Sequence, residues 1–194
     1  MESLTSTVTE LELADGARVF IAPTKAKDLV AVRGSVLGGW NMFPLGRGDI
    51  QTLAVDLLDA GTKSKSKDQI RESLSARGIS LSFSTGGDRT YFSGSCLPED
   101  LGFLLDTIVE CLTQADFPQK EVALAKERIL GEFEDAKNET KPQAAITLQR
   151  HLYTTSHLNY TLTTDERIAA LRSTTRAELL AFRKQLGRSG MVLS

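Results

Sequence analysis

The stretch Gly48–Thr62, GDIQTLAVDLLDAGT, carries the pattern that decides the fold. Its apolar residues recur at the spacing of one buried helical stripe, namely Ile50, Leu53, Ala54, Leu57 and Leu58. Asp49 suits the N-cap, because its carboxylate can accept a backbone N–H of the first turn. Gly61 suits the end, because glycine adopts a left-handed backbone without steric cost. We predict one helix over Gly48–Gly61, with its three leucines packed against a sheet.

Three strands are predicted before this helix. Thr7–Leu13 alternates polar and apolar residues, and its inward positions are expected to be Val8, Leu11 and Leu13. Arg18–Ala22 is the expected return strand after the turn Ala14-Asp15-Gly16, because Asp-Gly is a strong hairpin signal. Leu29–Leu37 begins almost continuously apolar, so we expect both of its faces to be covered.

Helices dominate the remainder of the chain. Capping boxes at Ser66–Gln69 and Thr175–Glu178 each predict a helix start. Two strands are expected between helices, at Ile79–Ser84 and Thr90–Cys96, and a last strand at Met191–Leu193. The other predicted helices are one from Pro98 and the segments Phe117–Lys137, Lys141–Leu152 and Thr164–Leu171. Because strands come early and helices late, the predicted class is α+β, a mostly antiparallel sheet with helices packed on one face.

Two of these helices have a predicted apolar face. In the helix from Pro98 the expected buried residues are Leu101, Leu104, Leu105, Ile108, Val109 and Leu112. In Lys141–Leu152 one side carries Ala144, Ala145, Leu148 and Leu152.

Composition and charge exclude several classes of function. The 194 residues carry a net charge of −2, so no global field attracts the chain to nucleic acid or to anionic lipid. The apolar runs are too short to span a bilayer, so neither a nucleic-acid partner nor a membrane span is expected. The N-terminal MESLTSTVTE lacks an apolar core, so we expect no signal peptide in it. The compartment of the parent protein, cytoplasmic or periplasmic, stays open.

The residues that most often bind metals are few. Cys96 and Cys111 are isolated in sequence and are expected to be free, buried thiols. His151 and His157, the only two histidines, are six residues apart, which matches neither spacing that places two side chains on one helix face. We therefore expect no metal site at these histidines.

The order of elements and motifs resembles the pitrilysin-like (M16) zinc peptidases, whose domains have a LuxS/metallohydrolase-like α+β fold. In that family a helix with His-x-x-Glu-His ends in apolar residues and Gly-Thr; its two histidines bind zinc and its glutamate activates water. Counting back from Gly61, these positions fall on Thr52, Val55 and Asp56, so both histidines and the glutamate are absent. The resemblance implies that the chain retains the helix of the zinc motif but lacks the residues that bind zinc and activate water.

A second motif supports the same resemblance. Family members carry a Glu-Arg-x-x-x-x-Glu run whose closing glutamate is the third zinc ligand, about 76 residues after the second histidine. Here Glu127-Arg128 is followed by Glu132, which lies 76 residues after Asp56. The residual third-ligand position therefore falls on Glu132. Without other ligands, the simpler interpretation of Glu132 is a solvated acid on a helix.

The resemblance implies a role without catalysis. Residues 7–194 are expected to form a single M16-type domain of a longer protein, with no zinc of its own. Its expected partners are another M16-type domain or subunit, which holds the zinc, and a peptide substrate enclosed between them. One alternative is an inactive assembly scaffold, similar to the core subunits of the respiratory bc1 complex. Another is a metal-dependent hydrolase that uses Asp56, Glu132 and a histidine.

Overall fold

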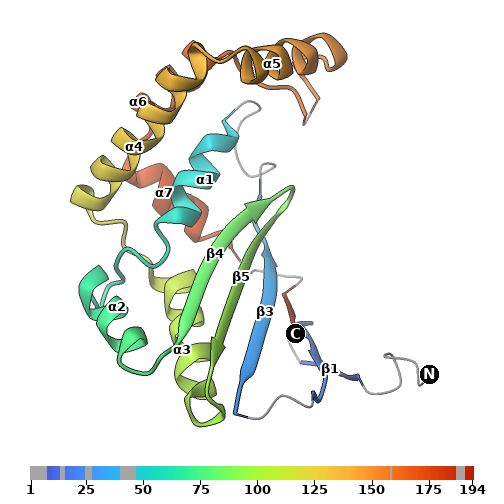
Figure 1. Ribbon diagram of the computed structural model, residues 1–194, viewed down its shortest axis with the longest axis vertical. Coiled ribbons are helices and arrows are strands. Elements are labelled where there is room, and N and C mark those ends of the chain that lie inside the picture. The colour runs from blue at the N-terminus through green and yellow to red at the C-terminus, as the bar shows by residue number, and fades with distance from the viewer. Residues whose placement is uncertain (1–7, 14–15, 25–27, 40–46, 158, 187–190) are drawn as a thin grey trace.

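A six-stranded sheet with helices on one face forms the lower body of the molecule, and an arm of helices rises above it (Figure 1). The computed structural model describes residues 8–13, 16–24, 28–39, 47–157, 159–186 and 191–194. The strands are β1 Thr9–Glu12, β2 Arg18–Ile21, β3 Val30–Leu37, β4 Ser80–Gly86, β5 Arg89–Cys96 and β6 Val192–Leu193. Their order is β1-β2-β6-β3-β5-β4, and all neighbours pair antiparallel except β2 with β6. The predicted α+β class with a mostly antiparallel sheet is confirmed.

The helices follow the sequence prediction in number and order. They are α1 Gly48–Asp56, α2 Lys67–Ser75, α3 Leu101–Gln114, α4 Gln119–Lys137, α5 Thr140–Leu152, α6 Thr164–Ser173 and α7 Arg176–Arg183, with a 3-10 turn, Pro98–Asp100, before α3. Both predicted capping boxes are present, at the starts of α2 and α7. No helix in the described part of the chain is long and apolar enough to cross a bilayer.

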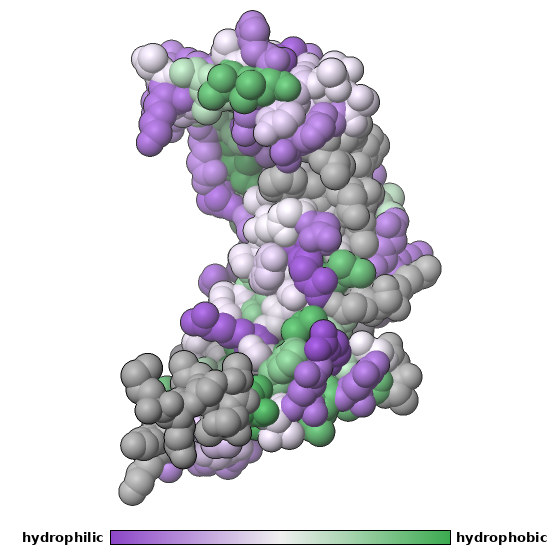
Figure 2. All heavy atoms as spheres, turned by 90° about the vertical axis from the view of Figure 1, so that its right-hand side faces the viewer, coloured by the Kyte–Doolittle hydropathy of each residue, from purple (hydrophilic) through white to green (hydrophobic). Residues whose placement is uncertain are grey.

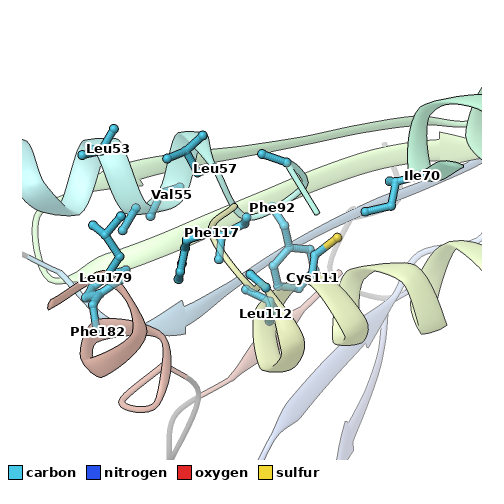
Figure 3. Close-up of a cluster of buried hydrophobic side chains, with 14 of the residues drawn as sticks. Leu53, Val55, Leu57, Ile70, Phe92, Cys111, Leu112, Phe117, Leu179 and Phe182 are labelled. Atoms are coloured by element: carbon cyan, nitrogen blue, oxygen red, sulfur yellow. The ribbon is translucent and has the colours of Figure 1, made fainter. Parts of the chain in front are cut away.

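Helix α1 lies at the centre of the core. The leucine stripe is buried as predicted: Leu53 in α1 and Leu58 in the turns that follow it are fully buried, and Leu57, the C-cap, is 4% exposed. Figure 3 shows side chains of α1 above Phe92 of β5, Leu112 of α3 and two residues of α7, Leu179 and Phe182. The apolar spacing of this one helix therefore joins the sheet to the helices at both ends of the chain.

The two ends of α1 differ from the prediction. The helix stops at Asp56 and continues as turns, so Gly61 does not cap it. Its N-cap is Arg47, which has no side-chain capping bond. Asp49 lies inside the first turn and forms a bidentate ion pair with Arg167 of α6, at 2.7 and 2.8 Å. Both carboxylate oxygens of Asp49 therefore accept charge-assisted hydrogen bonds from one guanidinium group, which links α1 to α6.

The predictions for strand burial were partly wrong. Val8, Leu11 and Leu13 are exposed, because the helices cover the sheet at β3 to β5 and not at β1, its outer edge. Strand β3 buries Val32 and Val36 on one face, whereas on its other face Ala31 and Arg33 are exposed and Ser35 is buried, so the second face is covered only in part. The turn residues Ala14 and Asp15 lie outside the described residues.

The predicted helix faces also need correction. In α3 Val109 is exposed, and Thr107 and Cys111 are buried instead, so the buried stripe is rotated slightly. In α5 no residue is buried, because the helix extends away from the body (Figure 1). The prediction for the cysteines is confirmed, since Cys96 and Cys111 are both free and buried.

The chain between α1 and α2 is anchored by a carboxylate of α3. Glu110 accepts hydrogen bonds from Thr62 at 2.6 Å, Ser64 at 2.5 Å and Lys65 at 2.6 Å. Burial alone would raise the pKa of Glu110, but these three hydrogen bonds and the charge of Lys65 outweigh it and lower the pKa to about 2. The ionised carboxylate thus stabilises the turn that follows α1.

We expect Glu110→Gln to lower the free energy of unfolding by about 1–3 kcal/mol at pH 7, because charge-assisted hydrogen bonds become neutral ones. Since the folded pKa of Glu110 is depressed, its contribution is present above the ordinary glutamate pKa and is lost as the pH falls toward 2. The difference between wild type and variant should therefore shrink between about pH 5 and pH 2. Urea unfolding at several pH values measures it, and a difference independent of pH would contradict the assignment.

Candidate functional site at the end of helix α1

Two of the residues predicted at zinc-ligand positions, Asp56 and Glu132, lie where α1 ends beside the middle of α4. Asp56 is the last residue of α1, and Arg128 and Glu132 are one helical turn apart on α4. The Nη2 atom of Arg128 lies 3.0 Å from Oδ2 of Asp56, and its Nη1 atom lies 2.6 Å from Oε1 of Glu132. One guanidinium group thus joins the two carboxylates that the sequence alignment places at ligand positions.

The guanidinium group of this cluster keeps its positive charge. The hydrogen bond with Glu132, followed by the contact with Asp56, raises the pKa of Arg128 further above its already high value. A guanidinium that stays protonated cannot act as a general base near neutral pH. All three side chains are exposed, so water and salt screen their attraction.

Val55, which the sequence analysis predicts at the place of the catalytic glutamate, is a core residue. Val55 is 1% exposed, and Figure 3 shows it within the buried cluster near Leu179 of α7. Thr52, one turn before Asp56, is half-buried. Of these three side chains only Asp56 could accept a proton from water, and its carboxylate already accepts a hydrogen bond from Arg128. This arrangement can cross-link α1 and α4 but has no acid–base pair.

Neither histidine joins the cluster through a hydrogen bond or ion pair. The Nδ1 atom of His151 lies 3.0 Å from the carbonyl oxygen of Thr147, within α5. His157 accepts a hydrogen bond from the backbone of Asn159 and stacks on Tyr153. Among the described residues there is no group of three His, Cys, Asp or Glu side chains that could hold a metal ion.

Sequence reasoning placed Asp56 and Glu132 as site residues but missed Arg128 between them. One signal was available, since Arg128 and Glu132 have the i, i+4 spacing of a helical ion pair. The contact of Arg128 with Asp56 spans 72 residues and had no local signal. The alternative of a hydrolase using Asp56, Glu132 and a histidine finds no support in these contacts.

We expect Arg128→Gln to lower the free energy of unfolding by less than about 1 kcal/mol, because exposed ion pairs contribute little. Arg172→Gln is a suitable control, since within the described ranges Arg172 forms one long ion pair, at 4.0 Å from Glu134. Denaturant unfolding of both variants measures the effect. A much larger loss for Arg128→Gln alone would mean that the cluster is a major determinant of stability.

The same region of the chain matches a known family. The family model described as insulinase (Peptidase family M16) matches residues 56–166, more than half of the chain. No curated protein matches the chain at a significant level.

Several solved structures share the fold. An M16 inactive domain from Pseudomonas fluorescens superposes with a TM-score of 0.83 at 20% identity, over 96% of this chain and 45% of that one. The periplasmic protease PqqL from Escherichia coli superposes with a TM-score of 0.82 at 17% identity, over 99% of this chain and 21% of that protein. A protease from Helicobacter pylori superposes with a TM-score of 0.79 at 15% identity, over 96% of this chain and 45% of that protein. The chain therefore spans less than half the length of each of these proteins.

Proposed function

The chain belongs to peptidase family M16, the insulinase family, and we propose that it acts there as a zinc-free domain. In this proposal it pairs with a zinc-bearing M16-type domain or subunit, and the two enclose a peptide substrate. Residues 7–194 form one domain of that larger assembly, and the zinc lies in the partner. The fact that solved relatives are more than twice as long supports a larger assembly.

The observation that carries the proposal is the residue set Thr52, Val55 and Asp56, whose only carboxylate is already ion-paired with Arg128. A catalytic zinc needs three protein ligands and an open fourth position. Here a permanent cation already occupies the space between Asp56 and Glu132, and it repels a second cation. Because Val55 offers no carboxylate, the water-activating group is absent as well. The chain can then contribute to peptide hydrolysis only through its surface.

The face of the sheet that the helices leave open fits a wall against which a peptide can lie. On this face Ser80 hydrogen-bonds Ser95 at 2.8 Å, and Ser82 hydrogen-bonds Ser93 at 2.9 Å, across β4 and β5. Hydroxyl groups can donate and accept hydrogen bonds, so they suit peptide groups of any sequence. Arg33, which is opposite Ser93 in the register, lies on the same face, so this polar surface supports contact with peptide groups and adds one cation beside them.

Reconstitution tests the proposal. The chain is mixed with an M16 protein from the same genome that has an intact His-x-x-Glu-His motif, and hydrolysis of an unfolded peptide is followed. We expect neither the chain alone nor the partner alone to match the turnover of the mixture. Heat-unfolded chain is the control. Hydrolysis by the chain alone would contradict the proposal, and binding without any gain in turnover would favour an assembly scaffold.

A further inference from the structure

Arg33 is an exposed cation on the open face of the sheet, the face that the helices leave uncovered. It lies in the middle of β3, and its neighbour Val32 is buried on the opposite, helical face. The guanidinium group of Arg33 has no ion pair and no hydrogen bond with any residue that the structure describes. A permanent positive charge with five N–H donors therefore points away from the body of the protein.

The side chains around Arg33 carry no charge. In the register Ser93 of β5 is directly opposite Arg33, and Ser82 of β4 is opposite Ser93. On the other side of β3 the backbone of Ser194 pairs with the backbone of Arg33. The neighbours of Arg33 in the described sheet are thus hydroxyl groups, which can hydrogen-bond a ligand but cannot neutralise the guanidinium group.

The acidic residues of the sheet lie at its far edge. Strands β2 to β6 contain no Asp or Glu, whereas β1 contains Glu10 and Glu12. The strand order places β1 three positions from β3. At the usual strand spacing this is about 14 Å, which exceeds the distance of about 8 Å over which physiological salt screens exposed charges. The two glutamates therefore leave the charge of Arg33 unbalanced.

The other two arginines of the described strands already have partners. The Nε atom of Arg18 donates a hydrogen bond to Glu10 at 2.8 Å. Arg89 donates from Nε to the hydroxyl oxygen of Ser35 at 2.8 Å and from Nη2 to its carbonyl oxygen at 3.3 Å. Arg33 is therefore the arginine of this surface whose donors are available to a ligand.

The serines beside Arg33 offer a further donor. In the pair of Ser82 and Ser93, 2.9 Å apart, one hydroxyl group donates to the other, so one of the two hydroxyl hydrogens remains for a ligand. An ionised carboxylate only accepts hydrogen bonds, and it can engage a guanidinium group through both of its oxygens. The chemistry of this place thus fits a carboxylate.

The open face is accessible to another chain. Ser80 and Ser82 are exposed, and Tyr91 is 41% exposed. The arm of helices does not close on the lower body that holds the sheet, as the hollowed outline in Figure 2 shows. An extended peptide can therefore lie across the strands at the level of Arg33, with every second side chain toward the sheet.

We propose that Arg33 selects peptides with an acidic side chain, aspartate or glutamate, and pairs with its carboxylate. This inference rests on the proposed role of the chain as a wall that encloses a peptide substrate, and it names the class of peptide that the wall favours. Because Arg33 is one cation at one fixed place, it favours an acidic residue at one position of the bound peptide. Negative charge at other positions brings no comparable gain.

Hydrolysis by the mixture of this chain with its zinc-bearing partner tests the role of Arg33. The substrates are a neutral, unfolded peptide rich in glutamine and a set of copies in which one glutamine at a time is replaced by glutamate. For glutamate at one position we expect kcat/KM to rise by about two- to fivefold, the gain expected from an exposed ion pair. This gain should diminish as salt is added.

Two substitutions at Arg33 separate its charge from its shape. In Arg33→Gln the positional preference should disappear, so that all peptides of the set have the same kcat/KM within about 1.5-fold. Arg33→Lys should retain part of the preference, because it keeps the charge but loses the bidentate geometry. Circular dichroism verifies that both variants are folded.

Arg172→Gln is the matched control. It removes the same charge from a side chain that is 65% exposed but lies on α6, in the arm of helices (Figure 1). This variant should show the same positional preference as the wild type.

The possible results separate this inference from the zinc-free role. Turnover that does not depend on the position of glutamate would overturn the role of Arg33, as would a preference that survives in Arg33→Gln or is lost in Arg172→Gln. In each of these cases the mixture still hydrolyses peptide, so the zinc-free role stands. If the mixture hydrolyses no peptide of the set faster than the partner alone, both proposals fail together.

Discussion

Replacement of Leu57 by alanine is expected to lower the free energy of unfolding by about 2–5 kcal/mol. Leu57 is 4% exposed and belongs to the cluster that joins α1 to the sheet and to α7 (Figure 3). Removal of its branched end leaves a cavity, because close-packed neighbours relax only in part. Urea unfolding followed by circular dichroism measures the change, provided that the dependence on urea is the same for both proteins.

The matched control for Leu57 is Leu124→Ala on α4, where the leucine is 52% exposed. This substitution should change the free energy of unfolding by less than about 0.5 kcal/mol. A loss of that small size for Leu57→Ala as well would mean that the buried stripe of α1 has been assigned to the wrong face.

The second large effect concerns metal binding. We expect Thr52→His with Asp56→His and Arg128→Ala to create a zinc site, with two imidazoles one turn apart and Glu132 as third ligand. Val55 is left unchanged, because it is 1% exposed and a buried carboxylate would destabilise the fold. Isothermal titration with zinc should give tight binding by this variant and negligible binding by the wild type.

Retention of Arg128 provides the control for this design. With Thr52→His and Asp56→His alone, the guanidinium still holds Glu132 and repels the dication, so affinity should be at least about tenfold lower. Equal, negligible binding by all three proteins would exclude the alignment of Thr52, Asp56 and Glu132 with zinc ligands. Tight binding by the wild type would contradict the zinc-free role.

Local patterns allowed much of the fold to be predicted. The leucine stripe of α1 and the capping boxes of α2 and α7 were identified correctly, because each depends on residues within a few turns of one another. The position of Asp49 was misjudged, since its partner Arg167 is 118 residues away. Local spacing cannot show which distant cation will compete for a carboxylate.

Burial was harder to predict than secondary structure. The alternation in β1 correctly groups residues by face, but it carries no information on whether another element covers that face, and Leu11 is exposed. The same limit applies to α5, where Leu148 and Leu152 of the predicted apolar side are exposed. In the site, the i, i+4 relation of Arg128 and Glu132 was available from sequence, whereas the contact with Asp56 required the packing of α1 on α4.

The cluster of Asp56, Arg128 and Glu132 also bears on how such a domain matures. A domain held together at this point by a metal ion would have a stability that varies with the free metal concentration around the newly made chain. Here the cation is part of the polypeptide, so the contact between α1 and α4 forms as soon as both helices have folded. On the zinc-free role proposed above, the domain would reach its final structure without waiting for metal delivery, and a metal-starved cell would still supply it in folded form.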